Sequence, residues 1–195
     1  MSVLFYWIIW GFWIYCAFLM NKTTYRSRMM FGLLIIIISA GYTFSFDEVN
    51  INGAWLLLLV AGYVFYMRRP LWQVFRLCLS NMTVTIVYSL IHIYWLMDPA
   101  IFLVIDPWIF SVVLAVFTMF IVKTYHERLV TGIIGIGQGN GLLMLIFYPY
   151  ENVLGNSEWL NTVAVCVLTM SIWEGLRLLS GKLQATLGKP FHERL

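Results

Sequence analysis

Polar side chains recur along one apolar stretch, residues 77–97, at the spacing of a helix face. They stand at positions i, i+4, i+7, i+8 and i+11, and they are Asn81, Thr85, Tyr88, Ser89 and His92. Inside hydrocarbon such a stripe must face protein or a water-filled path, because lipid offers no hydrogen-bond partner. The chemistry open to His92 is proton binding or transfer, since free imidazole titrates near physiological pH. A neutral histidine bonded to a neighbouring helix is the alternative, and the sequence leaves both open.

Asp106 is the acid that best suits this stripe. The chain has two Asp-Pro pairs, Asp98-Pro99 and Asp106-Pro107, and each has the form of an N-cap followed by proline in the first helical turn. We expect the helix to start at Pro99, because about 16 residues from Pro107 would span only ~24 Å of a ~30 Å hydrocarbon core. Asp106 would then lie in the membrane beside a proline kink, with the stripe around His92 as its partner. A start at Pro107 is the alternative, with the preceding apolar residues along the interface.

Residues 129–148, LVTGIIGIGQGNGLLMLIFY, are long enough to cross a bilayer but lack a clean apolar face at mid-depth. Two amides, Gln138 and Asn140, lie among five glycines, which are Gly132, Gly135, Gly137, Gly139 and Gly141. Glycine faces let neighbouring backbones approach closely, and the two GxxxG pairs in this stretch are a packing signal. We therefore predict that this helix is the hub of a bundle, surrounded by protein.

Signatures of the common enzyme and metal sites are absent from the sequence. HExxH, GxSxG, the Walker motif and GxGxxG do not occur, and the cysteines Cys16, Cys78 and Cys166 lie in apolar segments without CxxC spacing. We expect no metal site and no cofactor. Nucleic-acid binding is not expected either, because the basic residues are spread over four short loops.

Two further groups of charged residues are interpreted as structural. Glu174 and Arg177 stand three residues apart and can form an ion pair on one helix face, with a coupling or gating role as the alternative. An aromatic-His-Glu-Arg-Leu string occurs at residues 125–129 and again at 191–195. Chance explains this repeat better than a pair of matched docking sites or a two-histidine metal clamp does.

Long apolar segments must hold these groups in place. The 195 residues are 62% hydrophobic and only 11% charged, which is typical of polytopic membrane proteins. Segments near bilayer length fall at residues 2–20, 29–46, 51–67, 77–97, 99–122, 129–148 and 159–179. We therefore predict an all-α bundle of seven transmembrane helices over residues 1–179. A short basic tail, residues 180–195, is suited to lie on anionic headgroups.

Basic residues predict the orientation of this bundle. With seven spans, all twelve Lys and Arg residues fall on one side, while the opposite loops carry acidic residues and no Lys or Arg. The positive-inside rule makes the basic side cytoplasmic. The amino terminus is then outside and the carboxyl terminus in the cytoplasm. Dropping one span would scatter the basic residues over both faces, so charge supports the count taken from hydropathy.

Two known families have a similar layout. The SWEET sugar transporters share seven spans in a three, one, three plan, but their proline-glutamine signature is missing here, so this resemblance implies architecture alone. The opening SVLFYWIIWGFWIYCAFLM, the basic loop from Lys22 to Arg28 and the FGLLIIII span, with the chain length, resemble the YphA family of small membrane proteins from Bacillus and relatives. That resemblance implies a bacterial cell membrane. It carries no catalytic motif and no biochemical activity.

The favoured hypothesis is a non-enzymatic bundle that associates with lipid or another membrane protein, because hydrogen bonds between helices account for the polar residues. The alternative is a transporter of small solutes or ions with a polar path between the fourth, fifth and sixth helices. Its lining would be Asn81, Thr85, Ser89, His92, Asp106, Gln138 and Asn140. An enzyme acting on lipid would need a convergent acid, base or nucleophile set, and only His92 with Asp106 could begin one.

Overall fold

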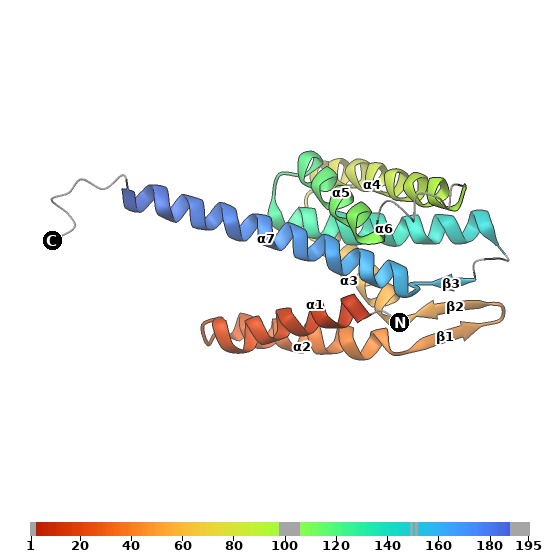
Figure 1. The fold of residues 1–195 in the computed structure, drawn as a ribbon, viewed down its shortest axis with the longest axis horizontal. Coiled ribbons are helices and arrows are strands. Elements are labelled where there is room, and N and C mark those ends of the chain that lie inside the picture. The colour runs from red at the N-terminus through yellow and green to blue at the C-terminus, as the bar shows by residue number, and fades with distance from the viewer. Residues whose placement is uncertain (1–2, 98–105, 149, 151, 188–195) are drawn as a thin grey trace.

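The computed structural model describes residues 3–97, 106–148, 150 and 152–187 as helices joined by short connections and one small sheet (Figure 1). The helices of this part are α1 (Val3–Ile14) with its π-helical continuation η1 (Tyr15–Leu19), α2 (Thr24–Ala40), α3 (Gly53–Met67), α4 (Leu71–Met97), α5 (Pro107–Ile121), α6 (Tyr125–Phe147) and α7 (Ser157–Leu187). The strands are β1 (Thr43–Phe46), β2 (Val49–Asn52) and β3 (Val153–Leu154). The prediction of a mainly helical fold is confirmed.

Three of the described helices are long and apolar enough to cross a bilayer, namely α4, α6 and α7 as far as Gln184. α1 with η1, α3 and α5 are apolar but shorter. Large apolar side chains cover the outside of the bundle, and Phe120 on α5 is 84% exposed. So much exposed apolar surface is unfavourable in water and favourable in hydrocarbon.

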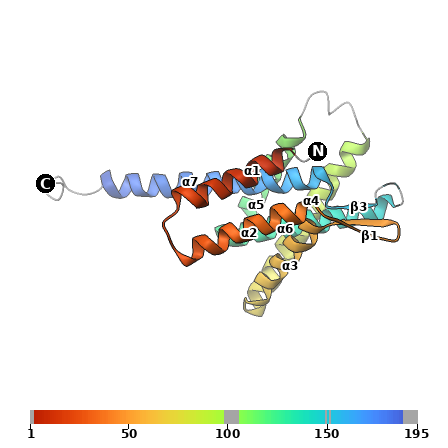
Figure 2. The same ribbon diagram turned by 90° about the horizontal axis from the view of Figure 1, so that it is seen from below.

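α6 lies at the centre of the bundle, as the two perpendicular views agree (Figures 1 and 2). It packs on α3, α4, α5 and α7 and also contacts β3. Half of its most apolar stretch, 50%, is buried, compared with 28% in both α4 and α7. The prediction that this helix is the hub is therefore confirmed.

The remaining helices build outward from this centre. α7 packs on α1, α5 and α6, and α2 packs on α1 and α3. Phe5 N donates a 3.0 Å hydrogen bond to Asn161 Oδ1, so α1 and α7 begin at the same end of the bundle. The core between α1, α6 and α7 contains side chains that are no more than 1% exposed, including Phe5, Ile136, Leu143 and Trp159.

The small sheet corrects the prediction that residues 29–46 form one helix. α2 ends at Ala40, and β1 pairs antiparallel with β2, which in turn pairs parallel with β3. Asp47 in the hairpin turn has a φ of 55°, a left-handed conformation that Asp tolerates better than most residues. The segment TFSF keeps two phenylalanines among its four residues, so hydropathy did not separate it from the helix before it.

Asn52 explains why the next helix starts later than the predicted residue 51. Its Oδ1 accepts a 2.9 Å hydrogen bond from Ala54 N, which caps α3, and its Nδ2 donates a 3.0 Å bond to the Ala40 carbonyl oxygen at the end of α2. The side chain is buried and joins the end of one helix to the start of the next. The chain therefore leaves β2 and enters α3 at Gly53.

The expectation that the fifth helix starts at Pro99 is wrong. The structure starts α5 at Pro107, with Asp106 at the N-cap position in an extended conformation (φ −65°, ψ 141°). Proline suits the first helical position because its φ is preset and its missing N–H is not needed there. Asp106 is exposed and lies before the helix, not within a membrane span. Residues 98–105 lie outside the described part of the chain.

α7 also differs from its predicted bounds. It runs to Leu187, so residues 180–187 continue the helix and do not form a separate tail. In Figure 1 its carboxyl-terminal part extends beyond the other helices. The second aromatic-His-Glu-Arg-Leu string, at 191–195, lies outside the described residues.

Candidate functional site

α4 and α6 run parallel and approach closely at two glycines of α6. A methyl group added at Gly135 would come within 2.6 Å of Val84 Cγ1, and one added at Gly139 would overlap the Tyr88 ring. Neither position has room for a side chain without movement of α4. The structure therefore places this GxxxG pair where two helices approach most closely, and its packing role stays a prediction.

The other glycines of the hub face different helices. A methyl group at Gly137 would lie 2.8 Å from Leu59 Cδ2 of α3, and one at Gly141 would lie 3.9 Å from Trp55 Cζ2 of the same helix. At Gly132 the neighbour is Met170 of α7, with its Cε 3.2 Å away. Glycines therefore allow close approach to α6 from three sides, although Gly141 leaves ordinary van der Waals space.

The polar residues of the predicted stripe meet the hub at this contact. Asn81 Nδ2 donates a 2.6 Å hydrogen bond to Gln138 Oε1, and Thr85 Oγ1 lies 3.2 Å from both Gln138 Oε1 and the Gly135 carbonyl oxygen. Ser89 Oγ donates a 3.4 Å bond to the Gly139 carbonyl oxygen. The structure therefore brings Asn81, Thr85, Ser89 and Gln138 together as one hydrogen-bonded cluster.

A tyrosine of α3 completes the cluster. Gln138 Nε2 donates a hydrogen bond to the Tyr63 hydroxyl oxygen, so Gln138 joins α3, α4 and α6. Asn81 is buried, and its Oδ1 has no hydrogen-bond partner in the part of the chain that the structure describes. The cluster is therefore largely, but not completely, satisfied from within the bundle.

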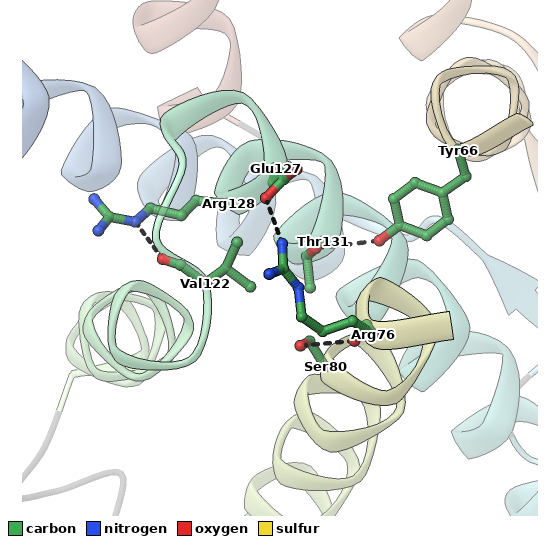
Figure 3. A network of polar contacts seen from close by, with 7 residues as sticks. All are labelled: Tyr66, Arg76, Ser80, Val122, Glu127, Arg128 and Thr131. Atoms are coloured by element: carbon green, nitrogen blue, oxygen red, sulfur yellow. Dashed lines mark hydrogen bonds and ion pairs between the residues drawn. The ribbon is translucent and has the colours of Figure 1, made fainter. Parts of the chain in front are cut away.

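An ion pair lies where α4 and α6 begin (Figure 3). Arg76 Nη2 is 3.4 Å from Glu127 Oε2, and the arginine side chain is 63% exposed while that of Glu127 is only 6% exposed. A buried carboxylate is costly unless it is paired, so Arg76 is important for holding the first turn of α6 in place. Ser80 Oγ donates a 3.0 Å bond to the Arg76 carbonyl oxygen.

Two further hydrogen bonds surround this pair (Figure 3). The Tyr66 and Thr131 hydroxyl groups are 3.1 Å apart and buried, which joins α3 to α6. Arg128 Nε donates a 2.6 Å bond to the Val122 carbonyl oxygen at the end of α5. Glu127, Thr131 and Gln138 stand at i, i+4 and i+11 of one helix, so they form a polar stripe along α6.

Asn140 does not join this cluster. Its Oδ1 accepts a 2.8 Å hydrogen bond from Gly155 N, in the turn between β3 and α7, where Gly155 has a φ of +74°. A side chain at Gly155 would also meet Trp55 Cβ at 2.5 Å. Asn140 therefore holds the connection that enters α7 against the hub helix, which is a structural role.

His92 lies near the opposite end of α4, against α7. Its Nε2 is 3.8 Å from Glu158 Oε2, and its ring contacts those of Tyr88 and Trp95. A cavity beside it measures only about 20 Å³, which is room for about one water. The acid that the structure pairs with His92 is thus Glu158, whereas Asp106 was expected.

The predicted ion pair on α7 is present. Glu174 Oε2 and Arg177 Nη1 are 3.5 Å apart, and the arginine is largely exposed. The Glu174 side chain is only 14% exposed, so the pair lies at the edge of the bundle with its cationic end in solvent. Among the described residues, no three His, Cys, Asp or Glu side chains gather closely enough to hold a metal ion.

A larger cleft of about 430 Å³ lies at the end of the bundle that carries the sheet. Its lining includes Thr43, Asn52, Asn152 and Asn156, which are uncharged. It is separate from the contact between α4 and α6, so it does not connect the polar cluster to solvent.

Sequence reasoning missed several residues of the polar network, among them Tyr63, Tyr66, Arg76, Glu127 and Thr131. The i, i+4, i+11 spacing of Glu127, Thr131 and Gln138 was the available signal. Glu127 precedes the predicted span, which begins at residue 129, and was considered only within the string at 125–129. The tyrosines are indistinguishable in sequence from the many aromatic residues that face lipid.

Comparison with known proteins places this bundle in a family. A model of the YphA-like integral membrane protein family matches residues 1–194. The chain belongs to the YphA-like integral membrane protein family. It is 21% identical over 168 residues to the "Uncharacterized protein YphA" of Bacillus subtilis (strain 168), which covers 85% of this chain and 83% of that relative. No solved structure matches the chain.

Membership identifies this YphA-like chain as an integral membrane protein, in agreement with its apolar exterior. In hydrocarbon, the polar cluster on α6 supplies hydrogen bonds between three helices. The arrangement is suited to fixing the relative positions of α3, α4 and α6. Most hydrogen-bond donors and acceptors of the cluster bond to one another.

Proposed function

We propose that this YphA-like protein is a non-enzymatic multi-pass bundle of the bacterial cytoplasmic membrane, which associates with lipid or with another membrane protein. The observation that carries the proposal is the closed contact between α4 and α6. Gln138 is bonded to Asn81, Thr85 and Tyr63, and side chains of α4 fill the space beside Gly135 and Gly139. A transport path would need room for solute along this line.

The proposal includes seven spans, with the amino terminus outside. Support comes from helix direction, because in seven spans the fourth and sixth helices run the same way and the third runs the opposite way. α4 does run parallel to α6. α3 runs antiparallel to α6, since Tyr66 lies beside Thr131 and Trp55 lies beside Gly137. α3 and α5 have 15 residues each and so reach only ~22 Å. A locally thinned bilayer accommodates helices of this length at modest cost.

Thiol accessibility tests whether the contact is dry. In a background without Cys16, Cys78 and Cys166, we expect Thr85→Cys and Ser89→Cys to resist a small water-soluble methanethiosulfonate reagent in native membranes. Ser45→Cys, on the exposed strand β1, is the positive control and should react fully. Rapid labelling at both position 85 and position 89 would contradict the proposal.

A small-solute or ion path remains the second candidate, and one observation favours it. Asn81 Oδ1 is buried without a hydrogen-bond partner among the described residues, as expected of an atom that awaits a ligand. Reaction at positions 85 and 89 that a permeant solute or ion blocks would favour this path over the dry bundle.

Orientation has its own test. A membrane-impermeant maleimide should label Ser45→Cys in intact cells, and should label Lys123→Cys only after the cells are permeabilised. Labelling of Lys123→Cys in intact cells would contradict the proposed orientation without affecting the dry-contact result.

A further inference from the structure

The turn between α3 and α4 carries arginines that have no acidic partner among the residues that the structure describes. Arg68 is the C-cap residue of α3 and Arg69 follows it, with the Arg69 guanidinium 4.8 Å from the centre of the Phe65 ring. Two acids are described at this end of the bundle: Glu127 is buried and paired with Arg76, and Glu174 is paired with Arg177. Neither Arg68 nor Arg69 has an ion pair in the described part of the chain.

Large apolar side chains flank these arginines on both sides in the sequence. Leu71 is 89% exposed and Trp72 is 78% exposed, and Met67 and Phe75 are also exposed. The rings of Trp72 and Phe75 stack with their centres 6.1 Å apart. In an integral membrane protein such residues lie among acyl chains, with tryptophan near the headgroup level.

We propose that this turn, residues 67–75, is a binding site for an anionic phospholipid of the cytoplasmic leaflet. Guanidinium groups match phosphate oxygens in geometry and remain charged, so Arg68 and Arg69 are suited to hold the lipid phosphate. The neighbouring Met67, Leu71 and Trp72 are suited to contact its acyl chains. The assignment to the cytoplasmic leaflet rests on the orientation in the proposed function.

The apolar flank decides between two sources of phosphate. A free phosphate ion would gain nothing from exposed leucine and tryptophan side chains. A phospholipid can place its phosphate on the arginines and its acyl chains on the apolar side chains beside them. Arg76 has a different role, because it compensates the buried Glu127 carboxylate. Its removal should destabilise the protein whether or not anionic lipid is present.

Native mass spectrometry of the purified full chain in a zwitterionic detergent measures this affinity directly. We expect dioleoylphosphatidylglycerol to bind more tightly than dioleoylphosphatidylcholine. Each arginine near an anionic surface contributes about fivefold in affinity, so the double variant R68Q/R69Q should bind phosphatidylglycerol roughly thirtyfold more weakly. K22Q/R28Q is the matched control, because both residues are exposed, lie on the same predicted side and lose the same charge.

Retention of the phosphatidylglycerol preference in K22Q/R28Q and its loss in R68Q/R69Q support the site. Equal losses in both double variants, or equal binding of the two lipids by the unmodified protein, would overturn it. Full displacement of the lipid by millimolar inorganic phosphate would overturn the choice of lipid. If R68Q/R69Q does not fold, R68K/R69K keeps the charge but not the bidentate geometry, and an unchanged affinity there would count against the guanidinium contacts. The thiol and orientation results are independent of all these outcomes.

Discussion

Asn81 on α4 and Gln138 on α6 are joined by a 2.6 Å hydrogen bond from Nδ2 to Oε1. The two residues lie 57 positions apart in the sequence, yet they are the centre of the polar cluster that joins three helices. In hydrocarbon neither amide has water as a substitute partner, so each depends on the other.

A double-mutant cycle on this pair should measure their coupling. Gln138→Leu alone leaves the Asn81 and Tyr63 groups without a partner, whereas Asn81→Leu with Gln138→Leu removes both amides. We expect a coupling energy of about 0.6–1.7 kcal/mol, which runs from the average to the maximum found for such bonds within membranes. The measurement is the free energy of unfolding in mixed detergent and dodecyl sulfate micelles. Additive effects of the two substitutions would mean that the bond contributes nothing to stability.

Substitution of Gly139 by alanine should destabilise the bundle. The added methyl group overlaps the Tyr88 ring, and overpacking of this kind costs about 1–3 kcal/mol. Gly32→Ala on α2 is the matched control, because no atom of another helix lies within 4 Å of the added methyl group. There the better helix propensity of alanine should leave stability unchanged or raise it by up to about 1 kcal/mol. Equal free energies of unfolding for the two variants would mean that α4 and α6 are not tightly packed at Gly139.

Removal of the Arg76 charge should also lower stability. Arg76→Gln leaves the Glu127 carboxylate buried, and we expect a loss of roughly 1–3 kcal/mol, less than for a fully buried pair because Arg76 is largely exposed. The double variant R76Q/E127Q should recover most of this loss, since no charge is then left unpaired. Arg68→Gln, which breaks no ion pair, should stay within about 0.5 kcal/mol of the unmodified protein. A loss in R76Q that E127Q does not reverse would assign the effect to packing.

The hub helix could be predicted from sequence because its signal is local. Gly135, Gly139 and Gln138 are unusual in an apolar span, and hydrocarbon leaves protein as their natural surroundings. Asn81, Thr85 and Ser89 were predicted to face inward for the same reason. Which helix they meet could not be predicted, since pairing depends on the packing of elements far apart in the sequence.

Other features carry no local signal. Thr43–Phe46 is apolar and follows an apolar helix, and its strand conformation depends on pairing with β2. The start of α5 rested on a length argument, whereas the structure accepts a helix of 15 residues from Pro107. Glu127 is charged and close to a loop, which in sequence predicts exposure. Its burial depends on the ion pair with Arg76, and that pairing cannot be deduced from composition.

The most direct test of the account is the parallel register of α4 and α6. The Cβ of a residue at position 135 would lie 2.8 Å from Val84 Cβ, closer than the ~3.5–4.5 Å of a disulfide, so α4 must move outward by about 1 Å for the bond to form. In the background without native cysteines, Val84→Cys with Gly135→Cys should cross-link on mild oxidation in native membranes. Val84→Cys with Gly141→Cys, which faces α3, should not. Cross-linking of the second pair without the first would contradict the hub arrangement.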